Sequence, residues 1–114
     1  MKYLNLGIKE GVSVMRLHPL CFVAWLEAAK IYNQRNITCT ITSVDELVAG
    51  RLENSLHYTV PHARAFDLRV WRIPLEVRKI LAEKIQVRLK KLSPYFQVIL
   101  KSNHIHIELD WRSK

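Results

Sequence analysis

The sequence has little of the residues that mark several classes of protein. Its 114 residues include only three glycines, four prolines and two cysteines. This composition, with 49% hydrophobic residues, excludes a collagen-like repeat, a low-complexity linker and a disordered tail. No apolar run approaches the roughly 20 residues that span a bilayer. The first residues also lack the apolar core and the cleavage site of a signal peptide. We expect one domain, residues 1–114.

The two cysteines, Cys21 and Cys39, each lie in an apolar run and are not arranged at a metal-binding spacing. We therefore expect buried free thiols rather than a disulfide or a zinc knuckle. Acidic residues are also scarce, because ten Asp and Glu stand against eighteen Lys and Arg, a formal net charge of +8. A chain this basic is attracted to polyanions such as nucleic acid, an acidic membrane or an anionic cell-wall polymer.

Two segments have the spacing of helices, from Pro19 to about Asn33 and from Pro74 to about Leu92. Each begins at a proline, which suits the first helical turn. We expect His18 at the entrance of the first helix. The predicted apolar stripes are Phe22, Trp25, Leu26, Ala29 and Tyr32 or Asn33 in the first helix, and Val77, Leu81, Ile85, Leu89 and Leu92 in the second.

Four segments alternate as strands do: Ile37–Thr42, Ala65–Trp71, Tyr95–Lys101 and His104–Asp110. The last two form a predicted hairpin, and short extended pieces are expected before Arg16, with turns at Gly7 and Gly11. The order of elements predicts an α+β fold, a mostly antiparallel sheet with helices on one face. A long polar stretch from Ser43 to about Ala63 separates two of the strands, and such a loop is usually functional.

The last strand carries the strongest chemical signal. Along it Ile105, Ile107 and Leu109 point to one face, and His104, His106, Glu108 and Asp110 point to the other. Two imidazoles two residues apart on one face can converge on one site, and neutral imidazole suits Zn²⁺. The alternative is a solvated polar face.

A second cluster adds to this signal. His57 lies in the long loop, and Asp67 lies on the polar face of the strand that follows it. Together with a histidine of the last strand they form a possible three-ligand set, which leaves a fourth tetrahedral position open, as a catalytic zinc site requires. Alternatively, His57 is an ordinary loop histidine and Asp67 pairs with Arg64 or Arg69.

Three segments in this order, Ser55–Tyr58, Ala63–Arg69 and His104–Glu108, resemble motifs of the zinc peptidases that cleave peptidoglycan stem peptides. These are the D-alanyl-D-alanine carboxypeptidases and L-alanyl-D-glutamate endopeptidases, which have small phage and prophage members. Their pattern is Ser-x-His, then Gly-x-Ala-x-Asp, then His-x-His on a late strand. The resemblance covers roughly residues 19 to 110 and implies the hedgehog/DD-peptidase-like fold.

The resemblance implies a role for each matching residue. His57, Asp67 and His106 would be the zinc ligands, and His104 would be the catalytic histidine that activates water or stabilises the oxyanion. Nine residues separate His57 from Asp67, where the family usually has about six, so His62 is an alternative first ligand. Glu108 lies on the same strand face and is able to orient a ligand histidine, although a flanking polar role is preferred for it.

The function implied is hydrolysis of amide bonds in peptidoglycan stem peptides, with Zn²⁺ as cofactor and no dedicated nucleic-acid partner. A product made in the cytoplasm without a signal peptide would act at the bacterial wall after release or delivery by a phage. Two alternatives stay open: a basic module that binds nucleic acid or the wall without catalysis, and a zinc-binding homologue without activity. We expect Trp25, Trp71 and Trp111 to pack in the core or at its rim. Arg51 and Arg69 are alternatives for binding a substrate carboxylate.

Overall fold

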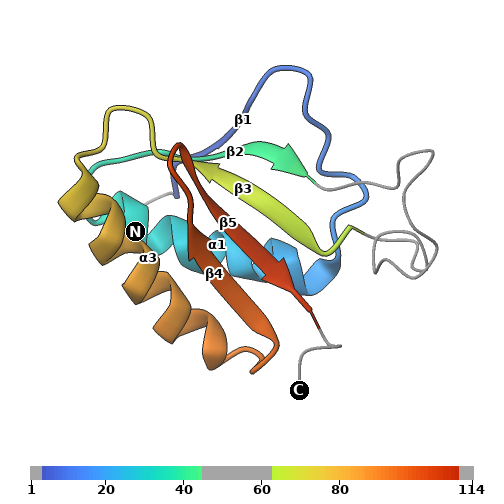
Figure 1. The fold of residues 1–114 in the computed structure, drawn as a ribbon. Coiled ribbons are helices and arrows are strands. Elements are labelled where there is room, and N and C mark those ends of the chain that lie inside the picture. Colours follow the sequence, from blue (N-terminus) through green and yellow to red (C-terminus); the bar gives the residue numbers. More distant parts are fainter. Residues whose placement is uncertain (1–3, 45–62, 111–114) are drawn as a thin grey trace.

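The fold consists of one sheet and two helices in the residues that the structure, a computed structural model, describes: 4–44 and 63–110. The elements in chain order are β1 (Leu6–Ile8), α1 (Pro19–Asn33), β2 (Cys39–Val44), β3 (Ala65–Arg69), α3 (Leu75–Lys90), β4 (Phe96–Leu100) and β5 (His104–Leu109). The strand order in the sheet is β1-β2-β3-β5-β4 (Figure 1). All neighbouring pairs are antiparallel except β1 and β2, which confirms the predicted α+β class.

The α1 helix begins at Pro19, as predicted, and α3 begins at Leu75, one residue after the predicted start. The Nδ1 atom of His18 accepts a hydrogen bond from the backbone N–H of Leu20 at 3.0 Å, so this side chain caps α1. Pro74 is the residue before α3. The buried faces are Cys21, Ala24, Trp25, Ala28, Ala29, Ile31 and Tyr32 in α1, and Leu81, Ile85 and Leu89 in α3. Leu26 and Leu92, which the spacing placed in the apolar stripes, are exposed.

The core lies between the helices and one face of the sheet. In Figure 1, α1 runs behind the strands and α3 lies alongside β4. Phe66 and Leu68 of β3 and Ile105 and Ile107 of β5 join the buried side chains of both helices in one cluster. The two cysteines are buried and free, as predicted. The opposite face of β3 and β5 therefore carries their alternate residues, which are polar except for Ala65.

The terminal hairpin joins the sheet through β5. Because β5 pairs with both β3 and β4, it is an interior strand and β4 forms the edge. The side-chain amide of Gln86 in α3 covers part of that edge, since it donates to the carbonyl of Phe96 and accepts from the N–H of Val98. This capping satisfies backbone groups that an edge strand otherwise leaves unpaired.

Gly7 differs from its prediction, because it lies inside β1 rather than in a turn. A Cβ atom at this position would come to 2.5 Å from Oγ1 of Thr40 on β2, so the close approach of the two strands requires glycine. Gly11 does lie in a turn, with φ +86°. Among the described residues, no helix is long and apolar enough to cross a membrane.

Candidate metal centre

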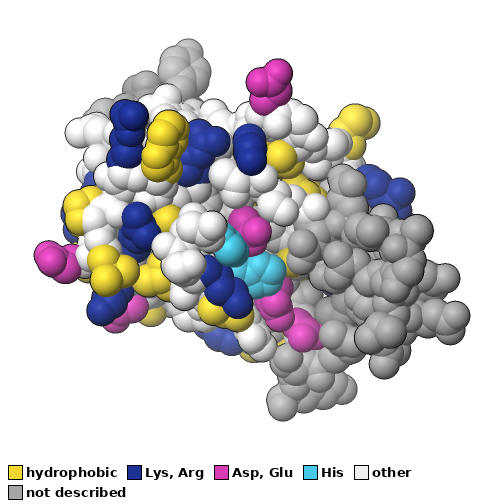
Figure 2. All heavy atoms as spheres, turned by 45° about the horizontal axis from the view of Figure 1, so that its top comes forward, with side chains coloured by type: hydrophobic (Ala, Val, Ile, Leu, Met, Phe, Trp, Pro, Cys, Tyr) yellow, Lys and Arg dark blue, Asp and Glu magenta, His cyan; other side chains and the backbone are white. Residues whose placement is uncertain are grey.

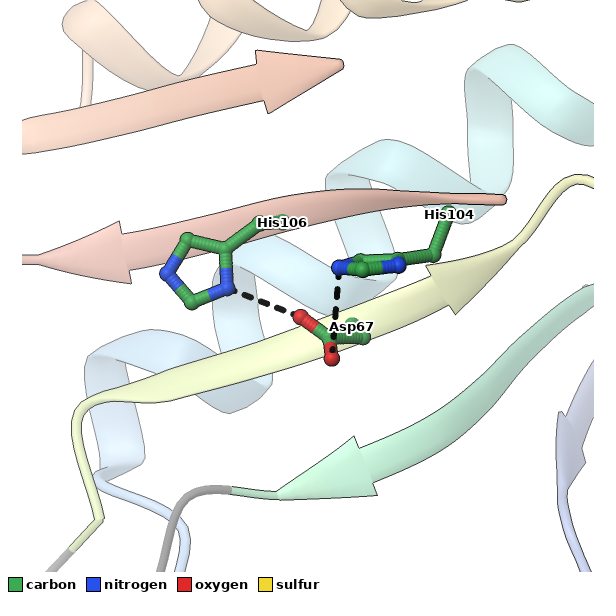
Figure 3. Close-up of side chains that lie close together, drawn as sticks. All are labelled: Asp67, His104 and His106. Carbon is green, nitrogen blue, oxygen red and sulfur yellow. Dashed lines mark hydrogen bonds and ion pairs between the residues drawn. The ribbon is translucent and has the colours of Figure 1, made fainter. Parts of the chain in front are cut away.

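Strand pairing brings the polar residues of β3 and β5 together. Asp67 is directly opposite His106 in the antiparallel register, and Arg69 is opposite His104. Side chains of directly opposed residues lie on the same face of a sheet, so the carboxylate meets the imidazoles there. Figure 3 shows Asp67 on β3 pointing toward both His106 and His104 on β5. The structure thus joins two residues that are 39 positions apart in the chain.

The distances within this group suit a small metal ion. One ligand atom from each of Asp67, His104 and His106 lies within 4.8 Å of the others. Oδ1 of Asp67 is 2.8 Å from Nδ1 of His106, and Oδ2 is 3.6 Å from Nε2 of His104. Donor atoms about 2.0–2.1 Å from a tetrahedral Zn²⁺ are about 3.3 Å apart, between these two values. Two imidazoles and one carboxylate are donors that Zn²⁺ accepts, so the group is a possible metal site.

His106 lies between two carboxylates. Its Nδ1 donates to Asp67, and its Nε2 donates to Oε1 of Glu108 at 2.8 Å. Because both ring nitrogens face acceptors, the protonated ring is favoured. The hydrogen bond to Asp67, with help from Glu108 and against the effect of burial, raises the pKa of His106 to about 9. A metal ion at Nδ1 would replace this proton and leave Glu108 to hold Nε2–H.

His104 is oriented by its neighbour in the turn. Nδ1 of His104 donates to the side-chain carbonyl oxygen of Asn103 at 2.6 Å. In the neutral ring this leaves Nε2 without a proton, and Nε2 is the atom that faces Asp67. His104 therefore presents a lone pair to the same space as the carboxylate, which suits either a ligand or a proton acceptor.

The structure brings together three of the four residues that were predicted for the site. Asp67, His104 and His106 lie together, whereas His57 and its alternative His62 fall outside the described residues. Asp67 faces histidines through both oxygens. Glu108, predicted as a flanking polar residue, contacts His106, and Asn103, for which no role was predicted, contacts His104. Both residues could have been found from the sequence, because both are polar and flank the His-x-His motif. Glu108 lies on the same strand face as the histidines, and Asn103 lies in the turn before them.

The group is open to a ligand from the outside. Figure 2 shows the histidine side chains at the surface, with acidic side chains against them and several Lys and Arg side chains on the same face of the molecule. The side chains of His106 and Asp67 are 17% and 19% exposed to solvent, and that of His104 is 27% exposed. Partly buried groups bind ions more strongly than fully exposed ones, and these side chains still reach the surface.

Comparisons with protein-family models, with curated proteins and with solved structures find no significant match to this chain. A fold class by itself does not define a function, so a function has to be inferred from the chemistry of the site. What the chain does possess is a small α+β domain with a possible His/His/Asp metal-binding group.

Proposed function

We propose that this protein is a zinc-dependent peptidase that hydrolyses amide bonds in peptidoglycan stem peptides. One observation carries the proposal: Asp67, from the Ala-x-Asp motif, lies within hydrogen-bond distance of His106, from the His-x-His motif. The second and third of the three motifs that resemble those of the zinc peptidases therefore supply neighbouring side chains, which supports the proposal. The net charge of +8 supports action on an anionic wall.

In this proposal Asp67 and His106 hold the metal together with His57, and His104 carries protons. Bound Zn²⁺ supplies Lewis-acid chemistry, because it polarises a carbonyl and lowers the pKa of water. Nε2 of His104, left unprotonated by the hydrogen bond from Nδ1 to Asn103, takes a proton from the attacking water and returns it to the leaving amine. Glu108 holds the ring of His106 in its orientation.

The test combines metal content with product analysis. Tag-free protein is incubated with zinc, desalted and assayed for zinc per chain, and then for the fragments it releases from purified peptidoglycan, identified by mass spectrometry. We expect about one zinc per chain and fragments cut within the stem peptide. His106→Ala should lose both. The control His18→Asn replaces a histidine outside the site and keeps a capping acceptor, so both readouts should stay unchanged.

The metal could be held by Asp67 and His106 with either His57 or His104, since the atoms of Asp67, His104 and His106 are also close enough to share a metal ion. A pair of variants distinguishes these two ligand sets. If His57 is a ligand and His104 carries protons, His57→Ala loses zinc while His104→Gln keeps zinc and loses cleavage. Loss of zinc in His104→Gln with retention in His57→Ala would assign His104 as a ligand instead.

The remaining outcomes separate the alternatives. Protein that binds zinc but releases no fragment would be a homologue without catalytic activity. Protein that binds no zinc would contradict the proposal, and salt-sensitive binding to a polyanion would then assign it to the basic binding modules.

A further inference from the structure

An arginine-tryptophan cluster lies at the end of β3, beside the candidate metal centre. We define it as Arg69, Trp71 and Arg72. The guanidinium carbon of Arg69 is 5.6 Å from the centroid of the Trp71 ring, and that of Arg72 is 4.6 Å from it. Both distances are in the range of cation–π interactions. Trp71 is 66% exposed, so it holds two guanidinium groups at the surface instead of filling the core or its rim.

The two positive charges of the cluster are not neutralised by the described part of the chain. Within residues 4–44 and 63–110, neither Arg69 nor Arg72 forms an ion pair. The indole attracts each guanidinium but leaves its charge in place. The folded protein holds both guanidinium groups close to one ring, so their side chains lose less freedom when they bind an anion.

The backbone at Arg72 adds an independent observation. The N–H of Ile73 donates to the carbonyl of Val70 at 3.0 Å, which closes a turn with Arg72 as its third residue. Arg72 has φ +65°, a conformation for which glycine or asparagine is the usual choice at this place in a turn. A strained residue with a long charged side chain indicates that the side chain is needed there.

The position of the cluster relates it to the candidate metal centre. Arg69 pairs in register with His104 and lies on the same strand face as Asp67, two residues earlier. Two residues of a strand, or of an extended peptide ligand, span about 7 Å. A ligand bound at Asp67 and His104 therefore extends over Arg69 within about two of its own residues. Trp71 and Arg72 also line a groove of about 720 Å³, and Arg35 lines the same groove.

We propose that Arg69 and Arg72, positioned by Trp71, form a carboxylate-binding subsite that recognises a free carboxylate of the stem peptide within about two residues of the bond that is cut. This inference rests on the proposed function. Guanidinium groups bind carboxylate and phosphate alike. Arg69 is next to His104, so one ligand can contact both the subsite and the candidate metal centre. The anionic groups of a stem peptide are carboxylates, so we favour a carboxylate over a phosphate as the bound group.

The experiment measures binding without cleavage. The full chain, kept metal-free with a chelator, is titrated with the peptide L-alanyl-γ-D-glutamyl-L-lysyl-D-alanyl-D-alanine. Binding is followed by the indole N–H signal of Trp71 in two-dimensional NMR, assigned from the spectrum of Trp71→Phe. The peptide is used as the free acid, as the C-terminal amide, and with the α-carboxylate of D-glutamate amidated. We expect one amidation to weaken binding about tenfold, as loss of a charged hydrogen-bond partner does.

Charge-matched variants assign that effect to the cluster. Arg69→Gln and Arg72→Gln should each reduce the difference between the acid and the weaker-binding amide, whereas Lys84→Gln, which removes one charge on α3, should preserve it. Equal binding of all three peptides by the unaltered protein would overturn the inference. So would a single-stranded oligonucleotide that binds more tightly and displaces the peptide, because the cluster would then bind phosphates.

The same peptides, incubated with zinc-loaded protein, separate this inference from the proposed function. Discrimination between acid and amide without any cleavage would contradict the peptidase and leave the anion subsite standing. Cleavage of all three peptides at the same rate, with no discrimination in binding, would support the peptidase and overturn the subsite.

Discussion

The two faces of β3 and β5 are made by alternate residues of the same two strands and differ in character. Toward the helices, Phe66, Leu68, Ile105 and Ile107 are excluded from water. On the other face, Asp67, His104 and His106 are partly exposed. His106 donates a hydrogen bond to Asp67, and Nε2 of His104 lies 3.6 Å from the same carboxylate. Alternation along a strand separates the two sets by a single residue. The comparison teaches that stability and chemistry can be encoded in the same two strands with little overlap.

The two faces should respond to different perturbations. The helix-facing side chains contribute through buried apolar area, which depends weakly on pH or metal. The polar face contributes through charges, so its energy changes with protonation and with ligand. Variants on one face should therefore change the free energy of unfolding, and variants on the other should mainly change metal or anion binding.

The largest effect on stability is expected from the helix-facing side. Ile107→Ala removes a fully buried side chain and should lower the free energy of unfolding by about 3 kcal/mol, measured by urea denaturation. Ile99→Ala on β4 is the matched control, because Ile99 is 37% exposed, and it should cost less than about 1 kcal/mol. Equal losses in the two variants would remove the distinction between the faces.

On the polar face, Glu108→Gln should weaken zinc binding by about 10- to 100-fold, as loss of a carboxylate behind a ligand histidine does. Chelator competition measures this affinity. The unfolding free energy of the metal-free variant should fall by much less than that of Ile107→Ala. Glu83→Gln on α3 serves as the control and should leave zinc affinity unchanged. Unaltered zinc affinity in Glu108→Gln would show that Glu108 does not orient His106.

The polar face should also make the metal-free protein sensitive to pH. The pKa of His106 is about 9 in the folded chain, against about 6.5 for a histidine in an unfolded one. Folding favours the protonated form, so this contribution to stability is complete below about pH 6.5 and is lost as the pH rises through 9. We expect a decrease on the order of 2 kcal/mol in the unfolding free energy over that range.

Urea denaturation with a chelator present, at several pH values between these limits, measures the decrease. His106→Asn should lack most of it, because the titrating ring is gone while the fold is retained. A variant with the same pH profile as the unaltered protein would assign the decrease to other groups.

The smallest effect is expected at Arg72. Arg72→Gly places glycine at φ +65° and should raise the free energy of unfolding by about 1 kcal/mol, while it weakens binding of the peptide acid. Asn36→Gly is the control, since Asn36 has φ +60° and asparagine tolerates this conformation, so its stability should hardly change. If Arg72→Gly is no more stable than the unaltered protein, the backbone at Arg72 carries no strain worth relieving.

The local elements could be predicted because their signals are local. The α1 helix has the bounds that Pro19 and the apolar spacing indicated, and α3 and the terminal hairpin agree within two residues at each end. The β1 strand could be predicted only as a short extended piece, because it has three residues and its place in the sheet depends on pairing with β2. Gly7 was assigned to a turn for the same reason: the atom that requires glycine there belongs to Thr40.

For the candidate site, the sequence by itself determined which residue types are present and which face of each strand they occupy. The alternation of His104, Ile105, His106 and Ile107 leaves one possible division between core and surface. Tertiary structure decided that β5, and not β4, lies beside β3, and that Asp67 is opposite His106. Pairing between strands so distant in sequence depends on the whole core, and a shift of one residue would turn every histidine to the wrong face.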